Sequence, residues 1–299
     1  MSMELLQRKI CEKRTPAMVS LNLTPALLPP SIWNGGTVAD LAAAYASWGK
    51  SVLDALADTI PAVKLHPVWF ERLGSRGLDV VRALCAHAQS LGYYVLLETG
   101  RSDHPAAAEL SAATYFGPLS AQNEPWEQPW PIDGLFIGGY TGSDGVKPYL
   151  AHCKTLNKSI FVQARTADKS AREVQDLISG DRVVHTAMAD LAVRWSVGME
   201  DGSGFSRVGV ALCPRTADSA TELRRRYERL FFLIPGRTVH GSSFKEMTRL
   251  FNKYGHGAVM EISSGLLDAW ERHPTDPAGA IQLAGERLRD ELARHVKVM

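Results

Sequence analysis

The segment "LLETGRSDHPAAAE" (97–110) brings together residue types that can move protons or hold charge. Glu98 and Asp103 supply carboxylates at the end of an apolar run, and His104 follows them directly. Such groups act as general acids or bases when their surroundings tune their pKa. Lys64 supplies an ammonium group near the end of the earlier run "PAVKL". We predict that Lys64, Glu98 and Asp103 form an active-site cluster; a structural ion-pair network is the alternative. His104 is either an acid–base group or a surface residue that begins a helix.

Eight apolar runs of strand length would position these residues. They are continuous rather than alternating, which is typical of parallel strands covered on both faces. Helical patterns such as 77–92 and 219–230 lie between them. The expected strands are 17–22, 61–65, 93–98, 134–139, 159–165, 207–212, 230–236 and 257–263. This alternation predicts an α/β fold, a (β/α)8 TIM barrel with extra terminal helices, as a single domain over 1–299. A doubly wound open sheet is the alternative.

A TIM barrel carries its chemistry at the C-terminal ends of its strands. The residues there are Asn22, Lys64, Glu98, Asp103, Gly138, Arg165, Arg237, His240 and Ser263. The irregular segment "GPLSAQNEPWEQPWPIDG" (117–134) predicts a loop or lid. Its two tryptophans either cap a ligand or pack over the barrel rim.

Composition narrows the classes of partner. The 299 residues are 45% hydrophobic and 22% charged with a net charge of +1, so no basic field favours nucleic acid or a membrane surface. No run approaches the ~20 apolar residues of a membrane span. The start shows no secretory signal pattern, and the four cysteines are far apart, so we expect a cytoplasmic protein with reduced thiols. No metal-ligand spacing occurs, so we expect no metal or cofactor; Mg²⁺ held by Glu98 and Asp103 is the alternative.

Five motifs, in order, carry a resemblance that spans nearly the whole chain. They are "MVSLNLTPALLP" (18–29), "AVKLHPVWFERLG" (62–74), "LFIGGYTGSDGVKPYL" (135–150), "IFVQARTADKSAREVQDL" (160–177) and "FFLIPGRTVHG" (231–241). Together they resemble the orotidine 5′-phosphate decarboxylase family, in its longer bacterial branch. The first is similar to that branch's V-G-L-D-x-x-P-x-L-L-P, and the last to its F-L-I-P-G-V-G-A-Q-G.

The resemblance implies an alternating lysine–aspartate array whose last three members come from a D-x-K-x-x-D motif. Here "ETGRSD" (98–103) occupies that motif, and Gly100 stands where the family has its catalytic lysine. That lysine stabilises the carbanion left by loss of carbon dioxide and delivers a proton to it. A preorganised donor is worth ~3–4 kcal/mol and a general acid ~10²–10⁴-fold. Arg101 cannot replace it, because it points to the other side and stays protonated. Standard decarboxylation is therefore not expected.

The resemblance also implies roles for the remaining positions. Lys64 takes the place of the first lysine, and Asp103 that of an acid that reaches the neighbouring subunit's site, which implies a homodimer. Asn22 stands for the ribose-binding aspartate, and Ser264 for a phosphate-binding arginine. Arg237 is either a replacement phosphate contact or a surface arginine. The predicted catalytic residues are Lys64, Glu98, Asp103 and His240, the last at a ligand-contacting position, and the predicted substrate-binding residues are Asn22, Arg165, Arg237 and Ser263.

These observations predict an enzyme that acts on a nucleotide or nucleotide-like phosphate by chemistry other than standard decarboxylation. Two alternatives stay open. One is a non-catalytic nucleotide- or phosphate-binding or regulatory protein. The other is a true decarboxylase with an unusual proton donor.

Overall fold

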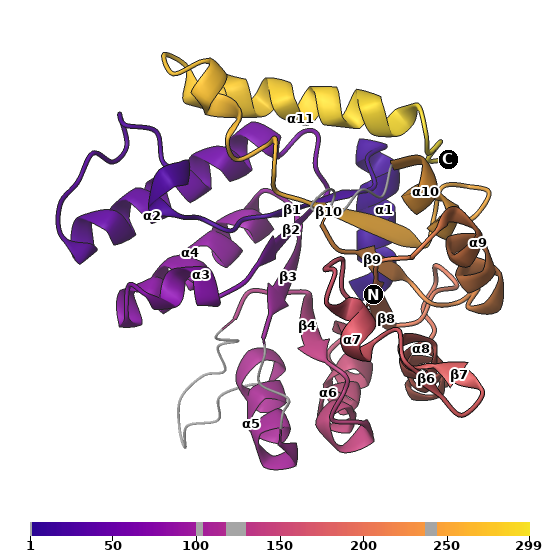
Figure 1. Ribbon diagram of the computed structural model, residues 1–299. Helices are drawn as coiled ribbons and strands as arrows, with labels where there is room; N and C mark the ends of the chain where they lie inside the picture. The colour runs from indigo at the N-terminus through magenta and orange to yellow at the C-terminus, as the bar shows by residue number, and fades with distance from the viewer. Residues whose placement is uncertain (1, 100–103, 118–129, 237–243) are drawn as a thin grey trace.

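The computed structural model describes residues 2–99, 104–117, 130–236 and 244–299, and its centre is a closed barrel of eight parallel strands (Figure 1). Around the barrel the order is β1-β10-β9-β8-β5-β4-β3-β2, and β1 pairs with both β2 and β10. This closure confirms the predicted (β/α)8 barrel and excludes the open sheet. The strands are β1 (Ala17–Ser20), β2 (Ala62–Leu65), β3 (Tyr94–Glu98), β4 (Gly134–Gly138), β5 (Ser159–Arg165), β8 (Val208–Leu212), β9 (Phe232–Ile234) and β10 (Ala258–Ile262).

Helices follow the strands and surround the barrel (Figure 1). The pattern at 77–92 falls on α4, and the pattern at 219–230 overlaps α9. A two-stranded hairpin, β6 (Ile178–Ser179) and β7 (Arg182–Val183), interrupts the connection from β5 to β8. The helices are α1 (Ser2–Lys13), α2 (Val38–Leu56), α3 (Val68–Glu71), α4 (Ser75–Ser90), α5 (Pro105–Phe116), α6 (Ser143–Thr155), α7 (Ala171–Val174), α8 (Val184–Trp195), α9 (Ala217–Arg226), α10 (Phe244–Met247) and α11 (Pro277–Ala293).

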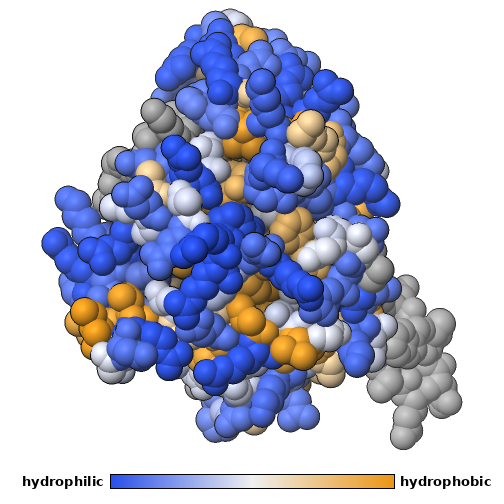
Figure 2. Space-filling model, turned by 90° about the vertical axis from the view of Figure 1, so that its right-hand side faces the viewer, coloured by the Kyte–Doolittle hydropathy of each residue, from blue (hydrophilic) through white to orange (hydrophobic). Residues whose placement is uncertain are grey.

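The surrounding helices bury one face and expose the other. In α2 the side chains of Tyr45, Trp48 and Leu53 are buried in the layer between strands and helices. The helix begins with a capping box in which Thr37 and Asp40 exchange hydrogen bonds, which satisfies backbone groups that have no partner inside a helix. On the face that Figure 2 shows, hydrophilic side chains predominate and the apolar ones form small separate groups.

The two terminal helices extend the barrel, as predicted. α11 packs on α2, and Gly285 permits their close approach: a Cβ added there would stand 2.6 Å from Leu56 Cδ2. α1 closes the N-terminal end of the barrel, where Met3, Leu6 and Ile10 are fully buried in the cluster that fills the barrel interior. The C-terminal ends of the strands therefore form the mouth at which a ligand can enter.

Two further expectations concern helices and thiols. Within the described parts of the chain, no helix is long and apolar enough to cross a membrane. The four cysteines are free; Cys85, Cys153 and Cys213 are buried and Cys11 is half-buried.

Candidate functional site

A lysine between two carboxylates lies at the mouth of the barrel. Lys64 comes from β2, Glu98 from β3 and Glu261 from β10. All three side chains belong to the set that points into the barrel, because side chains alternate along a strand and their neighbours Ala62, Leu96 and Val259 line the interior cluster. Closure of the barrel brings β10 to within one strand of β2, so that residues nearly 200 positions apart in the chain meet.

The Lys64 ammonium donates to both carboxylates. Its Nζ lies 2.7 Å from Glu98 Oε2 and 2.7 Å from Glu261 Oε1. The same nitrogen stands 5.0 Å from the centroid of the Phe136 ring, a cation–π distance. Lys64 is only 5% exposed, so solvent screens these contacts weakly.

This environment decides the protonation state of Lys64. Burial alone lowers the pKa of a lysine, but the charges of Glu261 and Glu98 and their hydrogen bonds outweigh it, and the pKa of Lys64 lies above its ordinary value. The side chain therefore stays an ammonium at neutral pH. It can stabilise negative charge or donate a hydrogen bond, whereas a nucleophilic role would need the free amine.

His66 stands beside this group and was not singled out from the sequence. Its Nδ1 lies 3.6 Å from Glu98 Oε2. Burial lowers the pKa of His66 below 6.5 despite the nearby carboxylates, so the ring is mainly neutral at pH 7. A neutral imidazole can accept or donate a proton, which makes His66 the described group best suited to proton transfer. Its position two residues after Lys64, and so on the same side of the strand, was the available signal.

Three buried oxygen atoms at this mouth have no hydrogen-bond partner among the described residues. They are Ser20 Oγ, Asn22 Oδ1 and Glu261 Oε2. The strand register places Ser20 directly opposite Lys64, and Asn22 follows two residues later. Buried polar groups are normally satisfied, so three such oxygens around one charged group indicate a place built for a polar ligand.

The described cluster also has a definite charge balance. One lysine and two glutamates give the three side chains a formal net charge of −1. The Lys64 ammonium has three donors, of which two go to the carboxylates. The geometry can therefore offer one positive donor, a neutral imidazole and acceptor oxygens to a ligand.

The other predicted residues divide into those that the structure describes, which come first, and those that lie outside the described ranges. Ser263 follows β10, half-buried, and its carbonyl accepts from the N–H groups of Leu266 and Leu267. Ser264 instead lines a separate cavity of about 240 Å³ against α11. His104 is the N-cap of α5, with Nδ1 accepting from Ala106 N at 3.2 Å, which matches the reading of this residue as a helix start.

Several predictions fall outside the described residues. Asp103, Arg237 and His240, and with them Gly100 and Arg101, lie in the ranges 100–103 and 237–243. Most of the expected loop at 117–134 also lies outside. Of its two tryptophans, Trp130 is described and packs against Tyr115 of α5 with ring centroids 5.2 Å apart.

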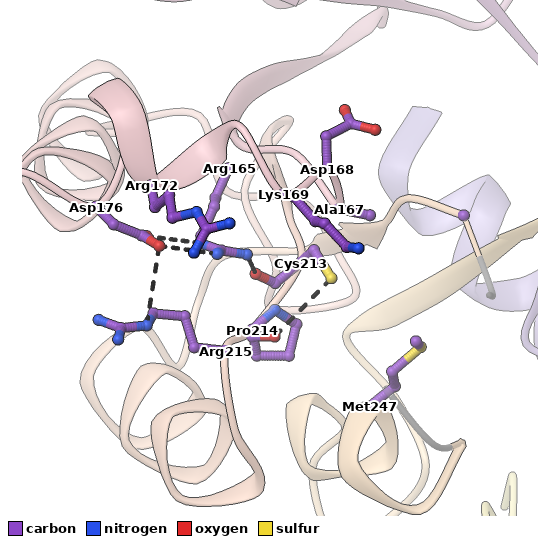
Figure 3. A pocket seen from close by; sticks show the side chains of 11 residues that line it. Arg165, Ala167, Asp168, Lys169, Arg172, Asp176, Cys213, Pro214, Arg215 and Met247 are labelled. Carbon is purple, nitrogen blue, oxygen red and sulfur yellow. Dashed lines mark hydrogen bonds and ion pairs between the residues drawn. The ribbon is translucent and has the colours of Figure 1, made fainter. Parts of the chain in front are cut away.

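Arg165 lies at the end of β5 and is held by an acidic partner (Figure 3). Its Nε and Nη2 donate to the two carboxylate oxygens of Asp176 at 2.8 and 3.0 Å, and its Nη1 donates to Cys213 O at 2.9 Å. The bidentate geometry fixes the guanidinium. Arg165 lines a cavity of about 430 Å³ whose other cationic residues are Lys169, Arg172 and Arg215.

The described residues contain no group of three or more histidine, cysteine or acidic side chains able to hold a metal ion. Where Glu98 and Glu261 approach each other, the Lys64 ammonium occupies the position between them. A magnesium site at Glu98 with Asp103 would involve a residue outside the described ranges.

Two known proteins with related sequences carry the same name. The chain is 28% identical over 232 residues to the orotidine 5′-phosphate decarboxylase of Rhodopirellula baltica, which covers 78% of this chain and 76% of that protein. It is 22% identical over 244 residues to the protein of that name in Caldicellulosiruptor bescii, covering 81% and 80%. The chain is similar to orotidine 5′-phosphate decarboxylases. No family model matches it.

The fold agrees with this similarity. The solved OMP decarboxylase of Leishmania donovani superposes with a TM-score of 0.74 at 22% identity, over 98% of this chain and 97% of that one. At this identity the likeness shows the barrel and its helices. The resemblance of the five motifs is thus supported by the name that the sequence relatives carry and by the fold of a solved structure.

Proposed function

We propose that this protein is an enzyme that acts on a nucleotide or nucleotide-like phosphate at the barrel mouth, by proton-transfer chemistry other than standard orotidine 5′-phosphate decarboxylation. The observation that carries the proposal is the buried Lys64 ammonium, held at 2.7 Å by two carboxylates, with the neutral His66 beside it. Lys64 would stabilise negative charge that develops on the ligand, and His66 would take or give the proton.

The charge balance argues against a substrate carboxylate at this position. A second anion brought to about 4 Å from a net negative charge meets a repulsion of ~4 kcal/mol at an effective dielectric constant of 20. A neutral ring or a sugar hydroxyl meets no such cost and can use the acceptor oxygens of Asn22 and Glu261. This favours proton transfer on a nucleotide without a carboxylate at the reacting carbon.

The roles read from the sequence enter the same proposal. Asn22 and Ser263 would contact ligand hydroxyls, while Asp103 and His240 would add an acid and an imidazole to the described cluster. Arg237 would contact the ligand's anionic group. Asp103 would reach the partner subunit's site in a cytoplasmic homodimer, which makes the dimer the functional unit.

Decarboxylation itself is the second candidate, because the curated relatives carry that name. It requires a proton donor at the carbon that loses carbon dioxide, and the motif position for this donor holds Gly100. Loss of a general acid costs ~10²–10⁴-fold, so the proposal predicts turnover far below a typical ~10 s⁻¹.

Two assays on the purified protein separate the candidates. Loss of ultraviolet absorbance reports decarboxylation of orotidine 5′-phosphate, and we expect no rate near ~10 s⁻¹. Proton NMR of uridine 5′-monophosphate in D₂O reports exchange of ring hydrogens, and we expect exchange that His66→Asn abolishes and the control variant His87→Asn, on α4, retains. Fast decarboxylation would refute the proposal. Nucleotide binding without exchange or turnover would support the non-catalytic alternative.

A further inference from the structure

A positively charged cavity lies across the barrel mouth from Lys64. It is lined by residues that follow β5 and β8, together with Gly236 after β9 and Met247 of α10. In the ring of eight strands β8 is four places from β2, which puts the cavity opposite the Lys64 cluster on the same face. Its volume of about 430 Å³ lies in the range of small-ligand sites.

The lining is cationic. Four of its side chains are basic, Arg165, Lys169, Arg172 and Arg215, and two are acidic, Asp168 and Asp176, so the lining carries a net charge of +2. Figure 3 shows these side chains arranged around one space, with Arg165 and Arg215 both directed at Asp176.

Asp176 is already neutralised by its neighbours. Arg165 holds both of its oxygens, and these hydrogen bonds are the main reason that the pKa of Asp176 lies below its ordinary value. His185 Nδ1 stands 3.2 Å from the same carboxylate and also contacts the carbonyl of Gln175 at 2.9 Å. The Arg165–Asp176 pair therefore forms a fixed wall of the cavity rather than a binding group.

The remaining basic side chains are available to a ligand. Lys169 and Arg172 have no hydrogen bond or ion pair within the described residues, and Arg215 reaches Asp176 only at 3.9 Å. All three are exposed on the cavity side that opens to solvent. Two guanidinium groups and an ammonium around one small space match a compact dianion, since guanidinium donors pair with phosphate oxygens in a bidentate manner.

We propose that this cavity binds the phosphate group of a phosphate monoester through Lys169, Arg172 and Arg215, with Arg165 fixed behind them by Asp176. A second observation supports this site. Ser264 stands at the position that the family resemblance gives to a phosphate-binding arginine, but it brings no charge and lines a different cavity. The claim that the cavity is the anion subsite for a nucleotide-like ligand rests on the proposed function. The claim that the cavity binds phosphate does not.

The test uses the full chain and inorganic phosphate. The double variant Lys169→Ala/Arg172→Ala removes two charges from the cavity, and Lys50→Ala/Arg82→Ala removes the same number from exposed positions on α2 and α4. Dissociation constants for phosphate are measured by calorimetry at fixed ionic strength. Losing one hydrogen bond to a charged group weakens binding roughly tenfold or more, so we expect at least that rise for the cavity variant and none for the control.

Three outcomes overturn the inference: no phosphate binding by the unmodified protein at tens of millimolar, an unchanged dissociation constant in the cavity variant, or an equal loss in the control. Uridine, which lacks the phosphate, should bind equally to the unmodified protein and the cavity variant. The variant Lys64→Met distinguishes this site from the proposed function, because it should lose ring-hydrogen exchange and keep phosphate binding.

Discussion

Replacing Lys64 by methionine removes the cation between Glu98 and Glu261 and keeps the length of the side chain. Both carboxylate oxygens lie 2.7 Å from the same nitrogen, so they cannot stand further apart than twice that distance. At about 5 Å and an effective dielectric constant of 20, two like charges repel by ~3 kcal/mol. Removing one partner of a buried ion pair costs ~3–5 kcal/mol, and the partial exposure of the glutamates, 21% and 11%, favours the lower value.

We therefore expect Lys64→Met to lower the Tm by roughly 6 °C or more at pH 7, since each kcal/mol is worth ~2–4 °C in a large domain. The matched surface variant Lys50→Met should leave the Tm within about 1 °C, because exposed charges contribute little. Adding Glu261→Gln to Lys64→Met should restore part of the loss, because one of the two repelling charges disappears. An unchanged Tm in the single variant, or no recovery in the double variant, would refute this account of the cluster.

The same cluster predicts how stability depends on alkaline pH. The folded protein holds the proton of Lys64 more tightly than the unfolded chain does, because its pKa is raised above 10.5. The stabilisation is complete below about pH 10.5 and is lost as pH rises through the raised pKa. Deprotonated Lys64 no longer separates the two carboxylates, so the Tm difference between the unmodified protein and Lys64→Met should shrink above that pH. A difference that stays constant to the highest pH at which the protein folds would contradict the shift.

Two further predictions concern His66 and the assembly. Burial lowers the pKa of His66, so the acid limb of kcat/KM for ring-hydrogen exchange should have its midpoint below pH 6.5, and a midpoint above that value would exclude His66 as the base. The folded protein also disfavours the protonated ring, so this residue's contribution to stability falls as pH drops below 6.5. Sedimentation at micromolar concentration should give twice the chain mass of 32.7 kDa, and a monomer would count against the shared site at Asp103.

The sequence predicts the barrel well because its eight strands are buried on both faces and therefore read as continuous apolar runs. It also predicts the pairing of Lys64 with Glu98, because consecutive parallel strands lie side by side in such a barrel. It misses His66, which stands two residues after Lys64, and Glu261. The run "GAVMEIS" marks a strand, but only closure of the ring brings that strand beside β1 and its carboxylate onto Lys64.

Arg165 and His104 show a different limit. Both were identified by position, and the structure gives each a local partner: Arg165 is held by Asp176, eleven residues later, and His104 caps the helix that begins at Pro105. In the sequence, a charged residue at a strand end looks the same whether it contacts a ligand or stabilises its own loop, because the sequence pattern does not show which residue it pairs with. The roles of Asp103, Arg237 and His240 stay predictions.

The helix that closes the base of the barrel has a consequence for the order in which the chain folds. α1 precedes every strand of the barrel in the chain, yet Gln7 Oε1 accepts a hydrogen bond from the backbone N–H of Gly257, 250 residues later, and Ser2 bonds to Ser159 between them. Its apolar face, with Leu6 and Ile10, packs into a cluster that is complete only when Leu233 of β9 and Val259 of β10 have joined it. During synthesis this face stays incompletely covered until β10 has been made, which invites chaperone binding or aggregation. A ribosome stalled before β10 would therefore carry a chain in which α1 is incompletely packed and sensitive to protease.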